Sequence, residues 1–243
     1  MSGIRLAAGG LIDRATPCFF SWNGATLQGY AGDTLASALL GSGISTVARS
    51  FKYHRRRGVV AAGAEEPNAL VQVGRGAYTV PNLKATQVEL YEGLTARSIN
   101  CWPSLEFDVG VVNNFMSRLL PAGFYYKTFM WPSGLWHTYE RRIRAAAGLG
   151  LAPTAPDPDR YEYMHAHCDV LVAGAGPSGI SAALAAARRG ARVILLDEQA
   201  RVGGSALHLP GAIDEVAGPE WVASAIAELE AMPDVTVLAR TTA

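Results

Sequence analysis

Residues 168–180 read Cys-Asp-Val-Leu-Val-Ala-Gly-Ala-Gly-Pro-Ser-Gly-Ile, and this stretch decides the fold of the second part of the chain. The apolar run Val170 to Ala173 predicts a strand that leads directly into glycines at positions 174, 176 and 179. The Ala-rich run that follows predicts a helix, which Gly190 ends. A strand, a Gly-x-Gly-x-x-Gly loop and a helix in this order present backbone N–H groups to a pyrophosphate.

Each glycine of this loop has its own expected task. Gly174 makes the tight turn, Gly176 lets a phosphate approach the backbone, and Gly179 packs the helix on the strand. Three glycines at this spacing are weak evidence alone, and a nucleotide-free turn also needs glycine. The ordered context of strand, loop, helix and second strand favours dinucleotide binding.

The second predicted strand covers residues 192–196 and ends at Asp197. Asp197 lies 23 positions after Gly174 (197 − 174), near the offset of about 20 for a ribose-binding acid. A carboxylate there accepts hydrogen bonds from ribose hydroxyls and repels a 2′-phosphate. We therefore expect NAD or FAD rather than NADP. Gly203 and Gly204 follow as a second place where backbone can approach the cofactor.

The composition describes a well-buried globular protein. Of 243 residues, 49% are apolar and 17% are charged, and the formal net charge is zero. This balance argues against general binding of nucleic acid or anionic membranes. With no apolar run of membrane-spanning or signal-peptide length, we expect a cytoplasmic protein. The three widely spaced cysteines indicate reduced thiols rather than disulfides or a metal site.

The first part of the chain predicts a β-grasp arrangement. Two runs, 17–22 and 25–30, flank Asn23-Gly24, a pair that favours a type I′ hairpin turn. We expect Asp33 to cap a helix over 34–40. Further strands are predicted at two places, residues 69–73 and residues 87–91.

An aromatic-rich stretch from Trp102 to Trp136 follows, which we expect to pack against another surface, within the protein or across a subunit boundary. A basic helix is predicted around 139–144, and the proline-rich stretch 152–158 is the expected interdomain linker. The resulting domain prediction is a β-grasp domain over 1–105, a connecting segment over 106–165 and a Rossmann-like domain over 166–243.

The end of the sequence predicts a helix over 221–232 and a third strand over 234–240. A parallel sheet of three strands has little to cover both its faces, although parallel sheets are normally buried on both sides. We therefore expect this sequence to be the N-terminal piece of a longer polypeptide. The intact mass of the native protein tests this expectation.

Several long irregular strings carry a family resemblance. They are Arg49-Ser-Phe-Lys-Tyr-His-Arg-Arg-Arg-Gly58, Ala62-Gly-Ala-Glu-Glu-Pro-Asn-Ala-Leu-Val-Gln-Val-Gly74, Ala96-Arg-Ser, Trp102-Pro-Ser-Leu-Glu-Phe-Asp-Val109, Pro121-Ala-Gly-Phe-Tyr-Tyr-Lys-Thr-Phe-Met-Trp-Pro132 and Ala166-His-Cys-Asp-Val170. With the glycine loop, they resemble the N-terminal quarter of the α subunits of heterotetrameric sarcosine oxidases. Related amine-oxidising and cyanide-forming dehydrogenase subunits share parts of the pattern.

The resemblance implies a ferredoxin-like β-grasp domain followed by an α/β Rossmann-like FAD/NAD(P)-binding domain. Relatives with an iron–sulfur cluster hold it by four thiolates after the first helix. This chain has no cysteine between Cys18 and Cys101, so we expect a domain without a cluster. The basic run 52–57 is interpreted as a solvated or subunit-facing loop, with a site for an anionic substrate or folate tail as the alternative.

The resemblance implies NAD+ as the dinucleotide, although the glycine loop alone does not separate NAD+ from FAD, because both share an ADP half. The implied cofactor-binding residues are Gly174, Gly176, Ser178, Gly179, Asp197, Glu198, Gln199, Gly203, Gly204 and Ser205. No metal ligand is predicted. No catalytic residue is assigned in this chain.

The implied reaction is the oxidative demethylation of sarcosine to glycine. Oxygen becomes hydrogen peroxide, and the one-carbon unit leaves as formaldehyde or methylene-tetrahydrofolate. The resemblance places FAD in the β subunit, FMN between α and β, folate handling in a later part of α, and γ and δ as further partners. The alternatives are an FAD-dependent amine, opine or glycine dehydrogenase subunit, and a non-catalytic assembly module.

Overall fold

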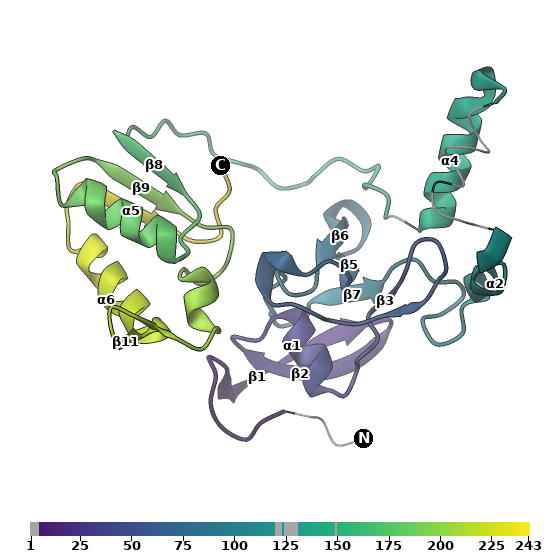
Figure 1. The fold of residues 1–243 in the computed structure, drawn as a ribbon, viewed down its shortest axis with the longest axis horizontal. Coiled ribbons are helices and arrows are strands. Elements are labelled where there is room, and N and C mark those ends of the chain that lie inside the picture. Colours follow the sequence, from purple (N-terminus) through teal and green to yellow (C-terminus); the bar gives the residue numbers. More distant parts are fainter. Residues whose placement is uncertain (1–4, 120–122, 124–130, 149) are drawn as a thin grey trace. The chain divides into compact units, whose positions relative to one another are not determined.

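The computed structural model describes residues 5–119, 123, 131–148 and 150–243. The chain divides into two compact units, Met1–Asp159 and Arg160–Ala243, each of which is described here by itself (Figure 1). The proline-rich stretch 152–158 contains no helix or strand and ends just before the division. The first unit is called unit 1 below, and the second is called unit 2.

Unit 1 is built on a mixed sheet of five strands in the order β2-β1-β7-β5-β6. Its strands are β1 (Asp13–Trp22), β2 (Ala25–Ala31), β5 (Leu70–Val73), β6 (Val80–Lys84) and β7 (Thr95–Ser98). Strands β1 and β7 are parallel, and the other neighbours are antiparallel. Helix α1 (Leu35–Gly41) packs buried leucines and alanines into the core of this sheet. The predicted β-grasp arrangement is confirmed.

The predicted hairpin at the start of unit 1 is also confirmed. Strands β1 and β2 are joined by Asn23 and Gly24, whose φ angles of 49° and 88° are both positive. A type I′ turn requires this geometry at both central positions. Asn and Gly tolerate it best, which is why the pair marked the turn in the sequence.

The strand predicted over 87–91 is wrong. Val88 and Leu90 are buried in alternation with exposed or half-buried neighbours, which is the pattern that suggested a strand. In the structure this segment makes one isolated bridge, between Thr34 and Glu89. Its backbone instead bonds to the start of α1, where Leu35 N–H donates to the Val88 carbonyl at 2.8 Å.

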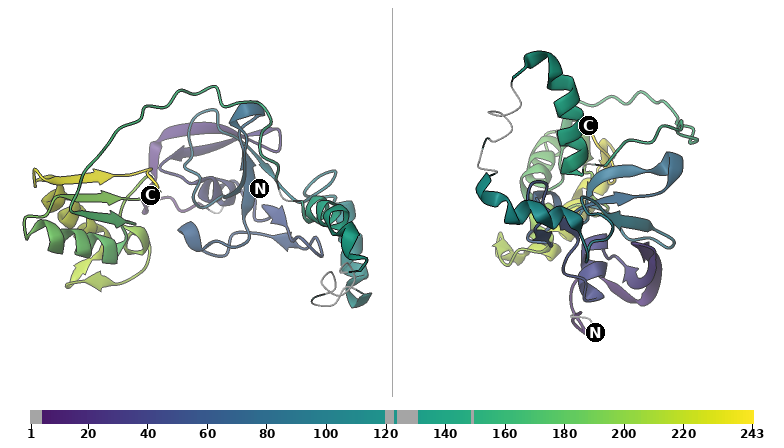
Figure 2. Two further views of the ribbon diagram at one scale, coloured as in Figure 1. Left: turned by 90° about the horizontal axis from the view of Figure 1, so that it is seen from above. Right: turned by 90° about the vertical axis from the view of Figure 1, so that its right-hand side faces the viewer.

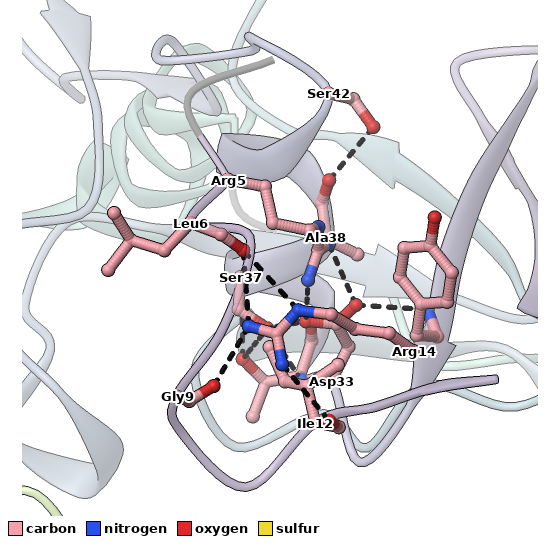
Figure 3. Close-up of polar contacts among 11 residues, drawn as sticks. Arg5, Leu6, Gly9, Ile12, Arg14, Asp33, Ser37, Ala38 and Ser42 are labelled. Atoms are coloured by element: carbon pink, nitrogen blue, oxygen red, sulfur yellow. Dashed lines mark hydrogen bonds and ion pairs between the residues drawn. The ribbon is translucent and has the colours of Figure 1, made fainter. Parts of the chain in front are cut away.

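The cap of α1 also differs from the prediction, because Thr34 rather than Asp33 is the N-cap. The Thr34 hydroxyl accepts from the backbone N–H of Ser37 at 3.2 Å, and the Ser37 hydroxyl accepts from the Thr34 N–H at 2.9 Å. This is a reciprocal capping box. The fully buried Asp33 carboxylate instead accepts two bonds from the Arg5 guanidinium, at 3.0 and 2.8 Å, and one from the Ser37 hydroxyl (Figure 3).

A second buried carboxylate, that of Glu66, organises the loop before β5. It accepts backbone N–H bonds from Val60, Ala61, Asn68 and Ala69, at 2.7 to 3.1 Å. Burial raises the pKa of Glu66, but these four donors outweigh that effect and hold the pKa below its ordinary value. The loop before β5 is therefore folded around the ionised side chain of Glu66.

The segment after β7 contains short helices, including α2 (Val112–Phe115) and α4 (Trp136–Ala147). The basic helix predicted around 139–144 is thus confirmed as part of α4, which ends at Gly148 with a φ angle of 66°. Four aromatics of the predicted aromatic stretch, Phe124, Tyr125, Tyr126 and Phe129, lie outside the described residues. Others are exposed to solvent: Trp102, Phe107, Phe115 and Trp131.

The remaining elements of unit 1 are short. A two-stranded ribbon, β3 (Ala48–Arg49) with β4 (Arg56–Arg57), follows α1. Single 3₁₀ turns occur at Gly63–Glu65, Gly76–Tyr78, Val109–Val111, Ser117–Leu119 and Ser133–Leu135. Because β3 and β4 pair with each other, the residues between them form a closed loop.

Unit 2 contains a parallel three-stranded sheet in the order β12-β9-β8. The strands are β8 (Val170–Ala173), β9 (Val193–Leu196) and β12 (Val235–Leu238), joined through α5 (Pro177–Ala187) and α6 (Gly218–Glu230). A small ribbon, β10 (Ala212–Ile213) with β11 (Val216–Ala217), precedes α6. The predicted strand-helix-strand-helix-strand order is confirmed.

Both helices of unit 2 lie on the same face of the sheet (Figure 2). Their side chains bury Ile180, Leu184, Val222 and Leu229 against the strands. Burial alternates along β8 and β12, and Leu171 on the other face is 53% exposed. Among the described residues, the helices therefore cover one face of this sheet and leave the other exposed, as expected for a parallel sheet with too little chain to cover both faces. No helix among the described residues is both long enough and apolar enough to cross a bilayer.

Candidate dinucleotide-binding site

The predicted glycine loop connects β8 to the N-terminus of α5. Gly174 follows the strand with a φ angle of 98°, a conformation that favours glycine. Gly176 is the N-cap of α5, and Pro177 occupies its first turn. N–H groups in the first turn of a helix lack partners within that helix, so those of α5 face outward at the end of the loop. The local fold is the one that the sequence predicted.

The three loop glycines are required for different reasons. A Cβ atom on Gly179 would lie 1.9 Å from the Gly174 carbonyl oxygen, so the close approach of the helix to the loop backbone excludes any side chain there. A Cβ on Gly176 would meet nothing within 4 Å, and its φ angle of −75° suits any residue. The protein itself therefore gives no reason for glycine at 176. Open space directly over a helix N-terminus fits a phosphate group.

The second glycine pair lies against this loop. Gly203 N–H donates to the Ala175 carbonyl at 2.7 Å, and Gly203 has a φ angle of 124°. A Cβ on Gly204 would lie 3.0 Å from the Gly176 Cα atom. Two backbone segments far apart in sequence thus meet around Gly176 without intervening side chains. Ser205 follows on the 3₁₀ turn Gly204–Leu207.

Asp197 stands at the end of β9, next to the same loop. Its side chain is buried, and one carboxylate oxygen accepts from the Ala175 N–H at 2.7 Å. The other oxygen accepts from the Gln199 N–H at 2.8 Å. An ionised carboxylate has about four acceptor positions, so two remain for further donors. Sequence reasoning assigned Asp197 to a ribose and missed that it also fastens the glycine loop.

The residues after β12 complete the surroundings of Asp197. Thr241 N–H donates to the Asp197 carbonyl at 2.8 Å, and Arg240 N–H donates to the Gln199 carbonyl at 3.0 Å. Glu198 is exposed beside them, and its carboxylate accepts from the Gln199 side-chain amide at 3.4 Å. Residues 240 and 241 were not predicted as part of the site. The available signal was their position after the third parallel strand, because ligands bind at the carboxyl ends of such strands.

The ion pair at the other end of the strands is separate from this site. Asp169 precedes β8 and binds Arg192, which precedes β9, through a bond of 2.8 Å. Hydrogen bonds from the Arg192 side chain and backbone lower the pKa of Asp169 to about 2. Because the strands are parallel, this pair lies at the amino ends of β8 and β9, and the glycine loop lies at the carboxyl end of β8.

The loop after α1 does not fit an iron–sulfur cluster. A plant-type centre requires four thiolates, and the cysteines of this chain are Cys18, Cys101 and Cys168. Arg49 is buried and donates to the Leu105 carbonyl and, at 3.0 Å, to the His54 carbonyl. His54 in turn contacts Asp108 with 2.7 Å between Nδ1 and Oδ2. A buried polar network occupies this loop, and no thiolate set is available for a cluster.

Two family models match the chain. Residues 15–101 match a family described as a 2Fe-2S iron-sulfur cluster binding domain, and residues 169–228 match one described as an FAD dependent oxidoreductase. The matched ranges fall in unit 1 and unit 2 respectively. The first match supports the ferredoxin-like fold. This chain lacks the four thiolates that the cluster named in that description requires.

Relatives match the chain along almost its whole length. It is 57% identical over 244 aligned residues to sarcosine oxidase subunit alpha of Rhizobium meliloti (strain 1021), covering 100% of this chain and 25% of that protein. It is 33% identical to the subunit of the same name from Corynebacterium sp. (strain U-96), covering 97% of this chain and 20% of that protein. The chain thus spans about a quarter or less of the length of these relatives. The resemblance inferred from the sequence is confirmed.

A solved structure has the same fold. The crystal structure of L-proline dehydrogenase from P. horikoshii matches with a TM-score of 0.52 at 15% identity, covering 94% of this chain and 34% of that one. Likeness at this level of identity concerns the fold alone. Together with the two family matches, it confirms the predicted fold class, a ferredoxin-like β-grasp domain followed by an α/β oxidoreductase domain with a parallel sheet.

Proposed function

We propose that this chain is the dinucleotide-binding portion of the α subunit of a sarcosine oxidase complex, and that unit 2 binds NAD+. The identity of 57% to a subunit of that name supports the family part of the proposal. The observation that carries the binding part is the open space over Gly176, at a helix N-terminus and beside an oriented carboxylate.

The proposed binding mode assigns one part of NAD+ to each element of the site. The pyrophosphate lies on the first turn of α5, over Gly176 and Gly204, with Ser178 and Gly179 as backbone donors. Asp197 accepts hydrogen bonds from the adenosine ribose through its remaining lone pairs, and Glu198 and Gln199 flank that ribose. Gly203 and Ser205 close the other side of the phosphates.

The chemistry that NAD+ can supply is hydride acceptance at its nicotinamide ring. We assign the bound molecule a largely structural role, because the reaction proposed for the complex uses flavins on other parts of the assembly. That reaction converts sarcosine to glycine, with oxygen reduced to hydrogen peroxide and the one-carbon unit released as formaldehyde or passed to tetrahydrofolate. The proposed partners are β, γ and δ subunits in the cytoplasm. No catalytic residue is assigned to this chain.

Flavin binding is a second candidate, favoured by the match of residues 169–228 to an FAD dependent oxidoreductase family. FAD carries the same ADP half as NAD+. The contacts proposed above for Gly176, Asp197 and Gln199 would therefore serve either molecule.

The cofactor released from the purified protein by heat separates these candidates. NAD+ binding predicts a colourless dinucleotide that alcohol dehydrogenase reduces, in one equivalent per chain beyond any flavin of the complex. A yellow, fluorescent dinucleotide released from the isolated α subunit would show that the bound cofactor is FAD rather than NAD+. Recovery of neither from freshly purified protein would leave an assembly module as the function of this part of the chain.

A further inference from the structure

The loop between β3 and β4 in unit 1 is fastened to the segment that follows β7. Arg49 donates to the Leu105 carbonyl, with its Nε atom at 3.0 Å. His54 contacts Asp108, and Arg55 Nε donates to the Asn114 side chain at 2.9 Å. Loop residues 50–57 and segment residues 102–115 therefore present one joined surface, although about fifty residues separate them in sequence.

Asp108 holds this arrangement in place. Besides His54, its carboxylate accepts from the backbone N–H groups of Trp102 and Gly110, each at 3.1 Å. A Cβ atom on Gly110 would lie 2.2 Å from the His54 ring, so the segment packs directly on the histidine. These hydrogen bonds already order the surface above Asp108. A partner that binds there would therefore cause little further loss of conformational entropy.

The exposed side of this surface is apolar and aromatic. Trp102 and Phe107 are each 71% exposed, Phe115 is 81% exposed, and Phe51 is 45% exposed. Lys52 and Arg55 lie over the ring of Tyr53, at 5.0 and 4.9 Å from its centroid. Aromatic, methionine and arginine side chains are the types enriched at protein interfaces. Clustered exposed aromatics are uncommon on a solvated protein surface.

The same surface carries an excess of positive charge. Residues 50–57 and 102–115 contain Lys52, Arg55, Arg56 and Arg57. Their acidic residues are Glu106, which is exposed, and Asp108, which is buried beneath the loop. The chain as a whole has no net charge, so this excess is local. We call the joined residues 50–57 and 102–115 the cationic–aromatic surface.

We propose that the cationic–aromatic surface docks another subunit through an acidic patch with an apolar centre. This inference rests on the proposed function only in assuming that the chain works in a multi-subunit assembly. A protein partner fits better than a nucleic acid, because the exposed apolar area is large and the neutral chain lacks the broad basic field of nucleic-acid binders.

The test uses the complete native assembly in its wild-type form. A carbodiimide joins lysines to carboxylates that are already in contact, and mass spectrometry identifies the linked peptides. We expect Lys52 to be linked to an Asp or Glu of another subunit, whereas Lys84, on β6, serves as the matched lysine control. Hydroxyl-radical labelling provides the second readout. Phe107 and Phe115 should be labelled at least about fivefold less in the assembly than in the dissociated subunit, with Tyr163, 96% exposed, unchanged.

Three results would overturn the proposal. These are equal labelling of Phe107 and Phe115 in both states, links from Lys52 confined to its own polypeptide, and protection that disappears after nuclease treatment. A double substitution, Lys52→Glu with Arg55→Glu, should also lower the amount of co-purified subunit about tenfold, with Arg141→Glu as the control. Dinucleotide content measured on the same samples keeps the two proposals distinct, because it reports on unit 2 alone.

Discussion

Asp197 and Ala175 are joined by a hydrogen bond of 2.7 Å, from the Ala175 backbone N–H to a buried carboxylate oxygen. Ala175 is the residue between the first two glycines of the loop, and Asp197 ends the neighbouring strand. The proposed ribose-binding side chain therefore also holds the proposed phosphate-binding loop. A change at Asp197 is therefore expected to affect both the ribose contacts and the position of the loop.

Replacing Asp197 by Ala should weaken dinucleotide retention and loosen the glycine loop together. A hydrogen bond to a charged group contributes about 1.5–3 kcal/mol, which corresponds to roughly 10- to 100-fold in affinity. Equilibrium dialysis measures the affinity, and hydrogen exchange of residues 174–180 measures the loop. Glu198→Ala is the matched control and should leave loop exchange unchanged. Full dinucleotide content with a protected loop in the Asp197 variant would contradict both roles.

Alanine substitutions at Gly176 and Gly179 should separate binding from folding. Gly176→Ala adds a methyl group into open space, so we expect unchanged thermal stability without ligand and a loss of dinucleotide affinity of at least tenfold. Gly179→Ala places a Cβ against the Gly174 carbonyl and should lower both stability and affinity. Calorimetry with and without added dinucleotide distinguishes these outcomes. Tight binding by the Gly176 variant would show that no phosphate lies over this position.

Glu66→Gln should destabilise unit 1 by about 2 kcal/mol or more, because four backbone N–H bonds to an ionised carboxylate are weakened at once. The pKa of Glu66 is lowered in the folded protein, so its contribution exists above the ordinary glutamate pKa and disappears as pH falls through the folded value. Denaturant unfolding at pH 7 and pH 3 measures both effects. The exposed Glu65→Gln is the control, and an equal effect there would exclude a special role for Glu66.

Acid should weaken unit 2 through Asp169. Its pKa falls from 3.8 to about 2 on folding, so the ion pair with Arg192 stabilises unit 2 above pH 4 and loses that effect as pH falls toward 2. Asp169→Asn should flatten the dependence of stability on pH in this interval. Hydrogen exchange of β8 and β9 between pH 5 and pH 2 follows the change. An unaltered pH profile would mean that the exposed pair contributes nothing measurable, as many surface pairs do.

The region matched to the iron-sulfur family should contain no stoichiometric iron or acid-labile sulfide. The reason is chemical, since no four thiolates are available after α1. Metal analysis and visible absorption of the purified α subunit provide the measurement. One full cluster per chain assigned to unit 1 would require ligands other than cysteine and would overturn this prediction.

Local patterns predicted much of the fold. The Asn23-Gly24 turn, the helices at α4 and α6 and the alternation of strands and helices in unit 2 could each be predicted because the required residues are adjacent in sequence. Errors arose where distant segments compete for the same backbone groups. The segment 87–91 has the alternation of a strand, but the Val88 carbonyl accepts from the Leu35 N–H at the start of α1. Asp33 has the side chain of a helix cap, but Arg5 binds it instead.

The type of site and most of its proposed residues could be proposed from residue order alone, because glycines, a helix start and a strand-end acid act within one short unit. How these residues contact one another is visible only in the folded protein. It brings Gly204 against Gly176 and ties Asp197 to Ala175, and it joins the loop at His54 to Asp108. These contacts depend on distances between segments far apart in the chain, which residue spacing does not encode.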